Sequence, residues 1–256
     1  MRYDTVFSQL LTLIFQITKM PNPFFRFKQF TVYHDQCAMK VGTDGVLLGS
    51  WADTSNCNSI LDIGSGSGLI SLMLAQRSNA RIDAVEIDRE AFLQSLENIN
   101  ASPWKERIHI NPTSFLEFYK NETKKYDLIV SNPPYFSNSL LPPNAGRQTA
   151  RHSDGGLTLK TLVQGASVLL NDTGKMAFIL PFDQINQLEE EARNNNLFFT
   201  KKTAVKTTPL SYPKRMLVEL AKHPVNLYEH EIIIETERHI YSEEFNRLTG
   251  DFYLDK

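Results

Sequence analysis

Short apolar runs alternate with helical patterns from about residue 59 onward, and this alternation limits the possible folds more than any other feature. Strands are expected at 59–63, 81–87, 107–110, 126–130 and 175–180, with helices at 69–76, 89–100, 157–170 and 183–194. A turn is expected at 172–174, where the sequence reads Asp-Thr-Gly. Strands that alternate with helices form a doubly wound, mostly parallel sheet with right-handed crossovers.

The last two expected strands, 198–205 and 215–221, have no helix between them. A parallel connection needs a crossover, so these two strands are expected to form an antiparallel hairpin. The sequence therefore predicts one α/β domain with a seven-stranded sheet whose last strand is antiparallel.

Composition and cysteine content exclude several classes of protein. The 256 residues include 41% hydrophobic and 22% charged residues, with a net charge of −2, which argues against disordered, collagen-like and coiled-coil chains. Cys37 and Cys57 lack the CxxC spacing of a zinc knuckle and are too few for a disulfide scaffold. We expect two buried thiols, no metal site and a cytoplasmic location.

The first 20 residues contain an apolar stretch at 6–17 that polar residues interrupt. A membrane span needs about 20 apolar residues, so no membrane association is expected. The following Lys19-Met20-Pro21-Asn22 contains no small-residue cleavage site, which argues against a secretory signal. The stretch is either a short packing helix or an upstream extension of a reading frame that naturally starts at Met20.

A glycine-rich loop follows the first strand of the alternating region. Gly64, Gly66 and Gly68 alternate with serines, and Asp62 precedes the first glycine by two residues. Glycines allow a tight turn and a close approach of the backbone to a ligand. A carboxylate at Asp62 would repel a pyrophosphate but can accept hydrogen bonds from an ammonium group. The pattern favours a cofactor with a cationic amino-acid end over a dinucleotide.

The end of the second strand carries Glu86, which can bind both hydroxyls of a ribose. With the glycine loop, this carboxylate points to S-adenosylmethionine as the cofactor. At the end of the third strand, Ser114 occupies the position expected to meet the adenine amine. The candidate cofactor residues of this core are Asp62, Gly64, Ser65, Gly66, Gly68, Glu86, Ile87 and Ser114.

The fourth strand ends at Asn132-Pro133-Pro134-Tyr135, at the edge of the sheet where such folds bind ligands. The side-chain oxygen of Asn132 and the carbonyl of Pro133 can accept the two hydrogens of a planar exocyclic amine. This would direct the nitrogen lone pair at a methyl donor. Tyr135 can stack on the target ring. We expect these four residues to carry the chemistry.

Together, the glycine loop, Glu86 and Asn-Pro-Pro-Tyr resemble class I methyltransferases that act on adenine N6 or glutamine N5. Residues 27–51 look very like the segment that precedes the core in bacterial tRNA1(Val) (adenine(37)-N6)-methyltransferases, and the resemblance continues to the C-terminus. It implies a Rossmann-like fold, S-adenosylmethionine, and methylation of the adenine just 3′ of the anticodon. It also implies that Lys40, Thr43 and Asp44 lie against the methionine end of the cofactor.

This family begins shortly before residue 27. The resemblance therefore implies that residues 1–19 are an extension without a role in the fold. Residues 20–256 would form the methyltransferase domain, with 20–58 as a lead-in that covers the cofactor site.

Charge is distributed unevenly near the end of the chain. Residues 197–224 contain six bases and one acid, whereas residues 225–256 contain eight acids and three bases. The basic stretch can follow RNA phosphates, with Tyr212 as a stacking surface, or it is a solvated strand protected by lysines. A long loop at 137–156 is placed to cover the target base. The candidate RNA contacts are Arg147, Arg151, His152, Lys201, Lys202, Lys206, Lys214 and Arg215.

The sequence predicts a monomeric tRNA adenine-N6 methyltransferase, with three alternatives. A protein glutamine-N5 methyltransferase would use the same tetrapeptide but typically has a separate N-terminal helical domain. A DNA adenine-N6 methyltransferase usually has a target-recognition domain that this length does not accommodate. A nucleotide-binding module without catalysis would have no reason to keep the tetrapeptide.

Overall fold

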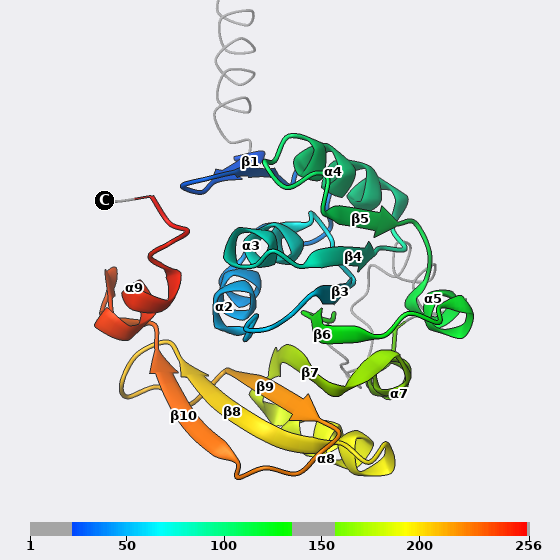
Figure 1. The fold of residues 1–256 in the computed structure, drawn as a ribbon. Coiled ribbons are helices and arrows are strands. Elements are labelled where there is room, and N and C mark those ends of the chain that lie inside the picture. Colours follow the sequence, from blue (N-terminus) through cyan, green and yellow to red (C-terminus); the bar gives the residue numbers. More distant parts are fainter. Residues whose placement is uncertain (1–21, 135–156, 255–256) are drawn as a thin grey trace, which may run out of the picture.

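A computed structural model describes residues 22–134 and 157–254, and its centre is an eight-stranded sheet (Figure 1). The strands lie in the order β10-β8-β9-β7-β6-β3-β4-β5. Their bounds are β3 Ser59–Ile63, β4 Arg81–Val85, β5 Ile108–Asn111, β6 Tyr126–Ser131, β7 Leu170–Pro181, β8 Phe198–Lys206, β9 Arg215–Ala221 and β10 Tyr228–Ile233.

The strand directions confirm the predicted topology. Strands β3 to β7 run parallel to one another, and β9 runs antiparallel to both β7 and β8. The eighth strand, β10, pairs in parallel with β8 and was not predicted. Its first four residues are exposed, so it lacks the alternation of buried and exposed positions that identifies a strand in a sequence.

Helices cover both faces of the sheet, as a doubly wound fold requires (Figure 1). On β6, Leu128 and Val130 face one core and Ile129 faces the other. The first core includes residues of α2 Thr43–Trp51, α3 Leu69–Arg77, α4 Arg89–Asn100 and α9 Glu243–Thr249. The second includes residues of α5 Phe115–Asn121, α7 Leu159–Leu169 and α8 Ile185–Asn194, the last of which follows a 3₁₀ turn, η1 Phe182–Gln184.

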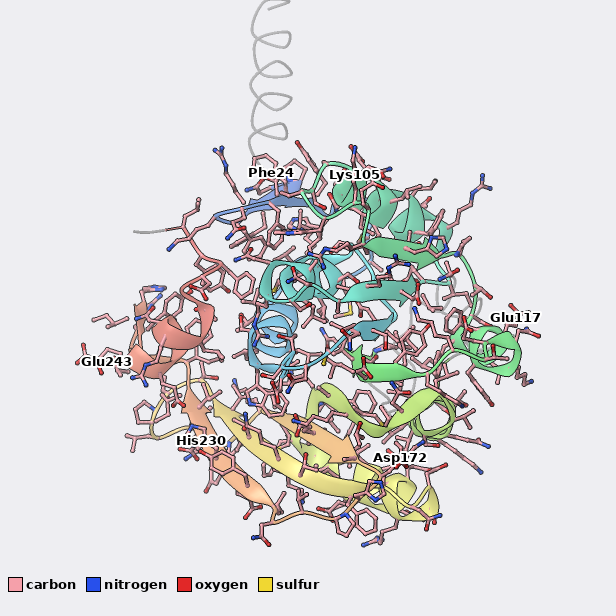
Figure 2. All side chains as sticks on the ribbon, in the orientation of Figure 1. Phe24, Lys105, Glu117, Asp172, His230 and Glu243 are labelled. Carbon is pink, nitrogen blue, oxygen red and sulfur yellow. The ribbon has the colours of Figure 1, made fainter. Side chains whose placement is uncertain are left out.

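The turn expected at 172–174 is wrong, because these residues lie inside β7. Leu170 pairs with Tyr126 and Lys175 pairs with Leu128, so the residues between them form a bulge against β6. A Cβ on Gly174 would lie 2.8 Å from the carbonyl oxygen of Tyr126, so the glycine permits a close approach of the two backbones. Asp172, labelled in Figure 2, is exposed on this bulge, 3.2 Å from His223.

The lead-in is anchored by the C-terminal segment. The lead-in contains a hairpin of β1 Phe24–Arg26 and β2 Thr31–Tyr33. The ring of Phe27 stacks on Tyr253 at 6.1 Å, and the backbone of Lys28 donates to the carbonyl of Phe252. A second hairpin, β11 Glu235–Glu237 and β12 Ile240–Tyr241, precedes α9. The two ends of the described chain therefore pack together.

Two glycines bring α2 close to α3. A Cβ on Gly45 would lie 2.9 Å from Leu69, and a Cβ on Gly49 would lie 2.7 Å from the sulfur of Met73. The spacing of four residues places both glycines on the same side of α2. Within residues 22–134 and 157–254, no helix is both long and apolar enough to cross a membrane.

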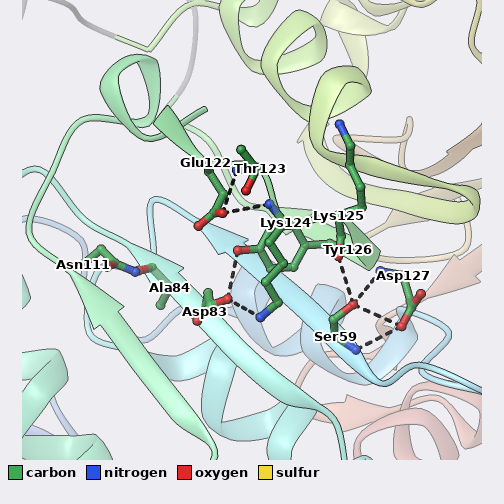
Figure 3. Close-up of polar contacts among 10 residues, drawn as sticks. All are labelled: Ser59, Asp83, Ala84, Asn111, Glu122, Thr123, Lys124, Lys125, Tyr126 and Asp127. Carbon is green, nitrogen blue, oxygen red and sulfur yellow. Dashed lines mark hydrogen bonds and ion pairs between the residues drawn. The ribbon is translucent and has the colours of Figure 1, made fainter. Parts of the chain in front are cut away.

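Polar contacts near the amino ends of the central strands join β6 to β3 and to β4 (Figure 3). Asp127 accepts hydrogen bonds from the backbone and hydroxyl of Ser59, at 3.0 and 3.1 Å. The hydroxyl of Tyr126 donates to Asp83 on β4 at 2.8 Å. These contacts hold the strands in register, so the positions of their carboxyl ends are set as well.

Candidate active site

The carboxyl ends of β3 and β6 meet at the point where the strand order reverses. The chain proceeds from β3 through β4 to β5, and then returns to place β6 on the other side of β3. Open α/β sheets bind their ligands at such a switch point. Ser131 pairs with Ile63, and its hydroxyl donates to the Ile63 carbonyl at 2.8 Å. The glycine loop and Asn132 therefore emerge from neighbouring strands.

The glycine loop has a backbone that other residues adopt rarely. Gly64, Gly66 and Gly68 have φ angles of +72°, +55° and +80°. A Cβ on Gly64 or Gly66 would meet nothing within 4 Å, whereas one on Gly68 would lie 2.6 Å from the hydroxyl of Ser95. The first two glycines thus leave a cradle open to a ligand, and the third allows α3 to approach α4 closely.

Asp62 supplies a buried acceptor beneath this cradle. Its Oδ2 accepts from the backbone and hydroxyl of Ser71, at 3.1 and 2.7 Å. Its Oδ1 is buried and has no hydrogen-bond partner. Burial raises the pKa of this carboxyl to about 6. An unsatisfied acceptor in this position fits the ammonium group of the cofactor predicted from the sequence.

Glu86 closes the other side of the loop. Its Oε2 accepts from the backbone of Gly66 and its Oε1 from the backbone of Asp88, both at 2.8 Å. The side chain is buried, and burial raises its pKa. Ile87, which follows it, is 62% exposed. The carboxylate is therefore held at the end of β4, where the sequence predicted a ribose contact.

Ser114 precedes α5 as its N-cap and already has a structural partner. Its hydroxyl oxygen accepts from the backbone of Glu117 at 3.1 Å, which is an N-terminal cap. This contact explains a serine at this position without a ligand. Its predicted contact with the cofactor adenine stays a prediction.

Two buried amides on α4, neither of them predicted from the sequence, hold the lead-in, and one of them also contacts the glycine loop. Asn98 donates to the carbonyls of Tyr33 and Ser67, at 2.8 and 2.9 Å. Gln94 accepts from the backbone of Gln36 at 2.9 Å. Polar residues four positions apart on a buried helix face were the available signal. They hold the lead-in against the cradle.

The lead-in residues predicted at the cofactor lie in and before the first turn of α2. Lys40 and Thr43 are exposed, and Asp44 is half-buried. The carboxylate of Asp44 receives a hydrogen bond from Nε of Arg215 at 2.7 Å. This ion pair joins one predicted cofactor residue to one predicted RNA residue.

The described part of the predicted catalytic tetrapeptide extends directly from β6. Asn132 is half-buried, Pro133 is buried and Pro134 is exposed. Pro133 cannot donate to a strand partner, so the sheet pairing of β6 ends at Ser131. Tyr135, Arg147, Arg151 and His152 lie outside the described residues.

The predicted basic stretch is partly neutralised by acids. Lys202 lies 2.6 Å from Glu189, and Lys206 lies 2.9 Å from Glu231. Lys201 lies over the ring of Trp51 at 4.4 Å, and Lys214 is exposed. Because β10 pairs with β8, the acidic end of the chain lies beside the basic strand. The two opposite charges are adjacent in space rather than on separate surfaces.

The two thiols agree only in part with expectation. Cys37 is buried as predicted, but Cys57 is half-buried; both are free. Burial, with Glu86 and Asp88 nearby, raises the pKa of Cys37 to about 12. Outside the gaps in the described chain, no three His, Cys, Asp or Glu side chains form a group able to hold a metal ion.

Comparison with known proteins identifies the family. The model of the methyltransferase small domain matches residues 37–187. A predicted O-methyltransferase from Agrobacterium tumefaciens has the same fold, with a TM-score of 0.63 at 18% identity, covering 82% of this chain and 96% of that one. The fold, the glycine loop and the matching family model define the chain as a methyltransferase.

Relatives of similar length narrow the family further. The chain is 51% identical over 236 residues to a protein of Parabacteroides distasonis and 48% identical over 237 residues to one of Bacteroides thetaiotaomicron. Each match covers 92% of this chain and 99% of the relative, and both relatives are named tRNA1(Val) (adenine(37)-N6)-methyltransferase. The chain belongs to this family, as its sequence motifs predicted.

Proposed function

We propose that this protein transfers a methyl group from S-adenosylmethionine to the exocyclic N6 of adenine 37 in tRNA1(Val). The observation that carries the proposal is the pairing of Ser131 with Ile63, which sets Asn132 beside the glycine loop at the switch point of the sheet. The names of relatives at 51% and 48% identity supply the substrate.

The chain's own residues account for cofactor binding. The open backbone of Gly64 and Gly66 admits the cofactor, and Oδ1 of Asp62 is available to its ammonium group. Glu86 is placed to accept the ribose hydroxyls at the end of β4. When bound, S-adenosylmethionine supplies an electrophilic methyl group on a sulfonium.

Asn132 and Pro133 position the adenine amine. The Asn132 side-chain oxygen and the Pro133 carbonyl accept its two hydrogens, which directs the nitrogen lone pair toward the methyl donor. The methylated nitrogen is acidic and loses its proton to water, so the chain needs no general base. In this proposal Tyr135 stacks on the base, and Lys40 and Thr43 contact the methionine end of the cofactor.

The proposal includes the RNA contacts predicted from the sequence. Arg147, Arg151 and His152 would cover the target base, while Lys201 and Lys214 contact phosphates. Lys202, Lys206 and Arg215 already face carboxylates, so RNA phosphates would compete with those acids. We further propose that the protein acts as a cytoplasmic monomer.

The test is methylation of unmodified tRNA1(Val) with labelled S-adenosylmethionine, followed by nucleoside analysis. We expect N6-methyladenosine at position 37. Label in protein would favour the glutamine-N5 alternative, and label in DNA would favour the DNA alternative. Asn132→Ala should abolish turnover while the Kd for S-adenosylmethionine stays near wild type, and retained turnover would refute the mechanism.

A further inference from the structure

The loop between β8 and β9, residues 207–214, displays two large apolar side chains to solvent. Leu210 is 97% exposed and Tyr212 is 91% exposed, the two highest exposed fractions among the large hydrophobic residues of the described chain. Single exposed hydrophobic residues are common on proteins. Two of them on one loop tip, with the basic Lys214 also exposed, suggest a contact surface.

The loop is held in a defined conformation. The hydroxyl of Ser211 accepts from the backbone of Thr208 at 3.0 Å, and the backbone of Ser211 donates to the Thr208 carbonyl at the same distance. At the base of the loop, the backbone N–H of Lys214 donates to the carbonyl of Val205. The carbonyl of Lys214 accepts from the backbone N–H of Phe182, which follows β7. Binding through this loop therefore loses less conformational entropy than binding through a segment without fixed structure.

The loop lies on the edge of the sheet that carries the active site. Strand β8 is parallel to β6 and β7, so its last residue, Lys206, is on the same edge as Asn132. Three strand spacings, about 14 Å, separate β6 from β8 along that edge. A hollow of about 120 Å³ at the base of the loop is lined by Thr207 and Lys214 and also by Thr43 of α2. The surface is therefore continuous with the start of α2, where Thr43 is a predicted cofactor contact.

We infer that residues 207–214 bind unpaired nucleotides of the substrate RNA that flank the target adenine. The ring of Tyr212 stacks on a base, Leu210 packs against the same or the next base, and Lys214 contacts a phosphate. Bases in single-stranded loops are recognised by stacking on exposed aromatic side chains beside positive charge, which is the chemistry displayed here. This inference rests on the proposed function and adds to it a contact outside the methyl-transfer pocket.

The test measures binding and turnover separately, for wild type, Tyr212→Ala, Tyr212→Phe and Leu210→Ala. Phe198→Ala is the matched control, because Phe198 is an exposed aromatic residue at the opposite end of β8. Binding of an unmodified tRNA1(Val) transcript is measured by filter retention without cofactor. Turnover is measured with saturating S-adenosylmethionine and varied tRNA.

We expect Tyr212→Ala to weaken RNA binding and raise KM for tRNA about fivefold to a hundredfold, with kcat and cofactor Kd unchanged. Tyr212→Phe and Phe198→Ala should remain near wild type, and Leu210→Ala should have a smaller effect in the same direction. Wild-type affinity for RNA in Tyr212→Ala, or an equal loss in Phe198→Ala, would overturn the inference.

The two proposals fail in different ways. If the wild type methylates tRNA and Tyr212→Ala binds it equally well, the inference on residues 207–214 is wrong and the proposed function stands. If RNA binding depends on Tyr212 but no N6-methyladenosine forms, residues 207–214 bind RNA as inferred and the proposed methylation is wrong. If the wild type binds no RNA but retains another protein through Tyr212, the inference is wrong.

Discussion

Gly68 ends the glycine loop with a φ angle of +80°, immediately before α3. Alanine at this position would have two costs. A left-handed backbone costs a non-glycine residue about 1–2 kcal/mol. The new Cβ would also lie 2.6 Å from the Ser95 hydroxyl, and overpacking of this kind costs about 1–3 kcal/mol. We therefore expect Gly68→Ala to lower the free energy of unfolding by about 2–5 kcal/mol.

Ser95 allows the two costs to be separated. Its hydroxyl is buried without a hydrogen-bond partner, so Ser95→Ala alone should be close to neutral. The Cβ of Ser95 would lie 3.6 Å from an alanine at position 68, which is an ordinary contact. The double variant should therefore be more stable than Gly68→Ala by the overpacking cost of about 1–3 kcal/mol, and only the backbone cost should remain.

The measurement is urea unfolding of the ligand-free wild type, both single variants and the double variant, analysed as a double-mutant cycle. Gly66→Ala is the control: its φ is +55° and its Cβ would meet nothing within 4 Å. Its free energy of unfolding should fall only by the cost of the left-handed backbone. It should nevertheless bind S-adenosylmethionine poorly, because the Cβ projects into the space left open by the glycine loop. Additive effects of Gly68→Ala and Ser95→Ala would refute the packing argument.

Three further predictions concern the buried carboxyl, the first residues and the RNA contacts. Burial raises the pKa of Asp62 from 3.8 to about 6, so the folded state binds the extra proton and stability falls as pH rises through this window. Asp62→Asn should remove this pH dependence and raise the unfolding free energy at pH 7 by up to about 3 kcal/mol. It should also weaken cofactor binding. If the urea midpoints of the variant differ between pH 4.5 and 7 as much as those of the wild type, the prediction is contradicted. Deletion of residues 1–19 should leave the Tm and turnover unchanged, and a large loss of either would show that the segment belongs to the domain. Arg147→Ala and Arg151→Ala should weaken tRNA binding less at high salt than at low salt, with cofactor affinity near wild type, whereas an equal loss of cofactor binding would argue against an RNA role.

The predictions from sequence succeeded where a signal is local. The β3 and α4 boundaries match expectation because apolar spacing within a few residues decides them. The strand β10 was not predicted because it lies at an edge of the sheet with most of its side chains exposed. The bulge at 172–174 was predicted as a turn because bulges and turns favour similar residues.

The sequence by itself determined the doubly wound class, the tight turns at Gly64, Gly66 and Gly68, and the end of β6 before Pro133. Each follows from backbone preferences or periodicity of residues that are neighbours in the chain. Only the tertiary structure decided that β10 lies beside β8, that Asn98 joins Tyr33 to Ser67, and that Oδ1 of Asp62 is left without a partner. These depend on contacts between residues far apart in sequence, and no local preference specifies which distant groups meet.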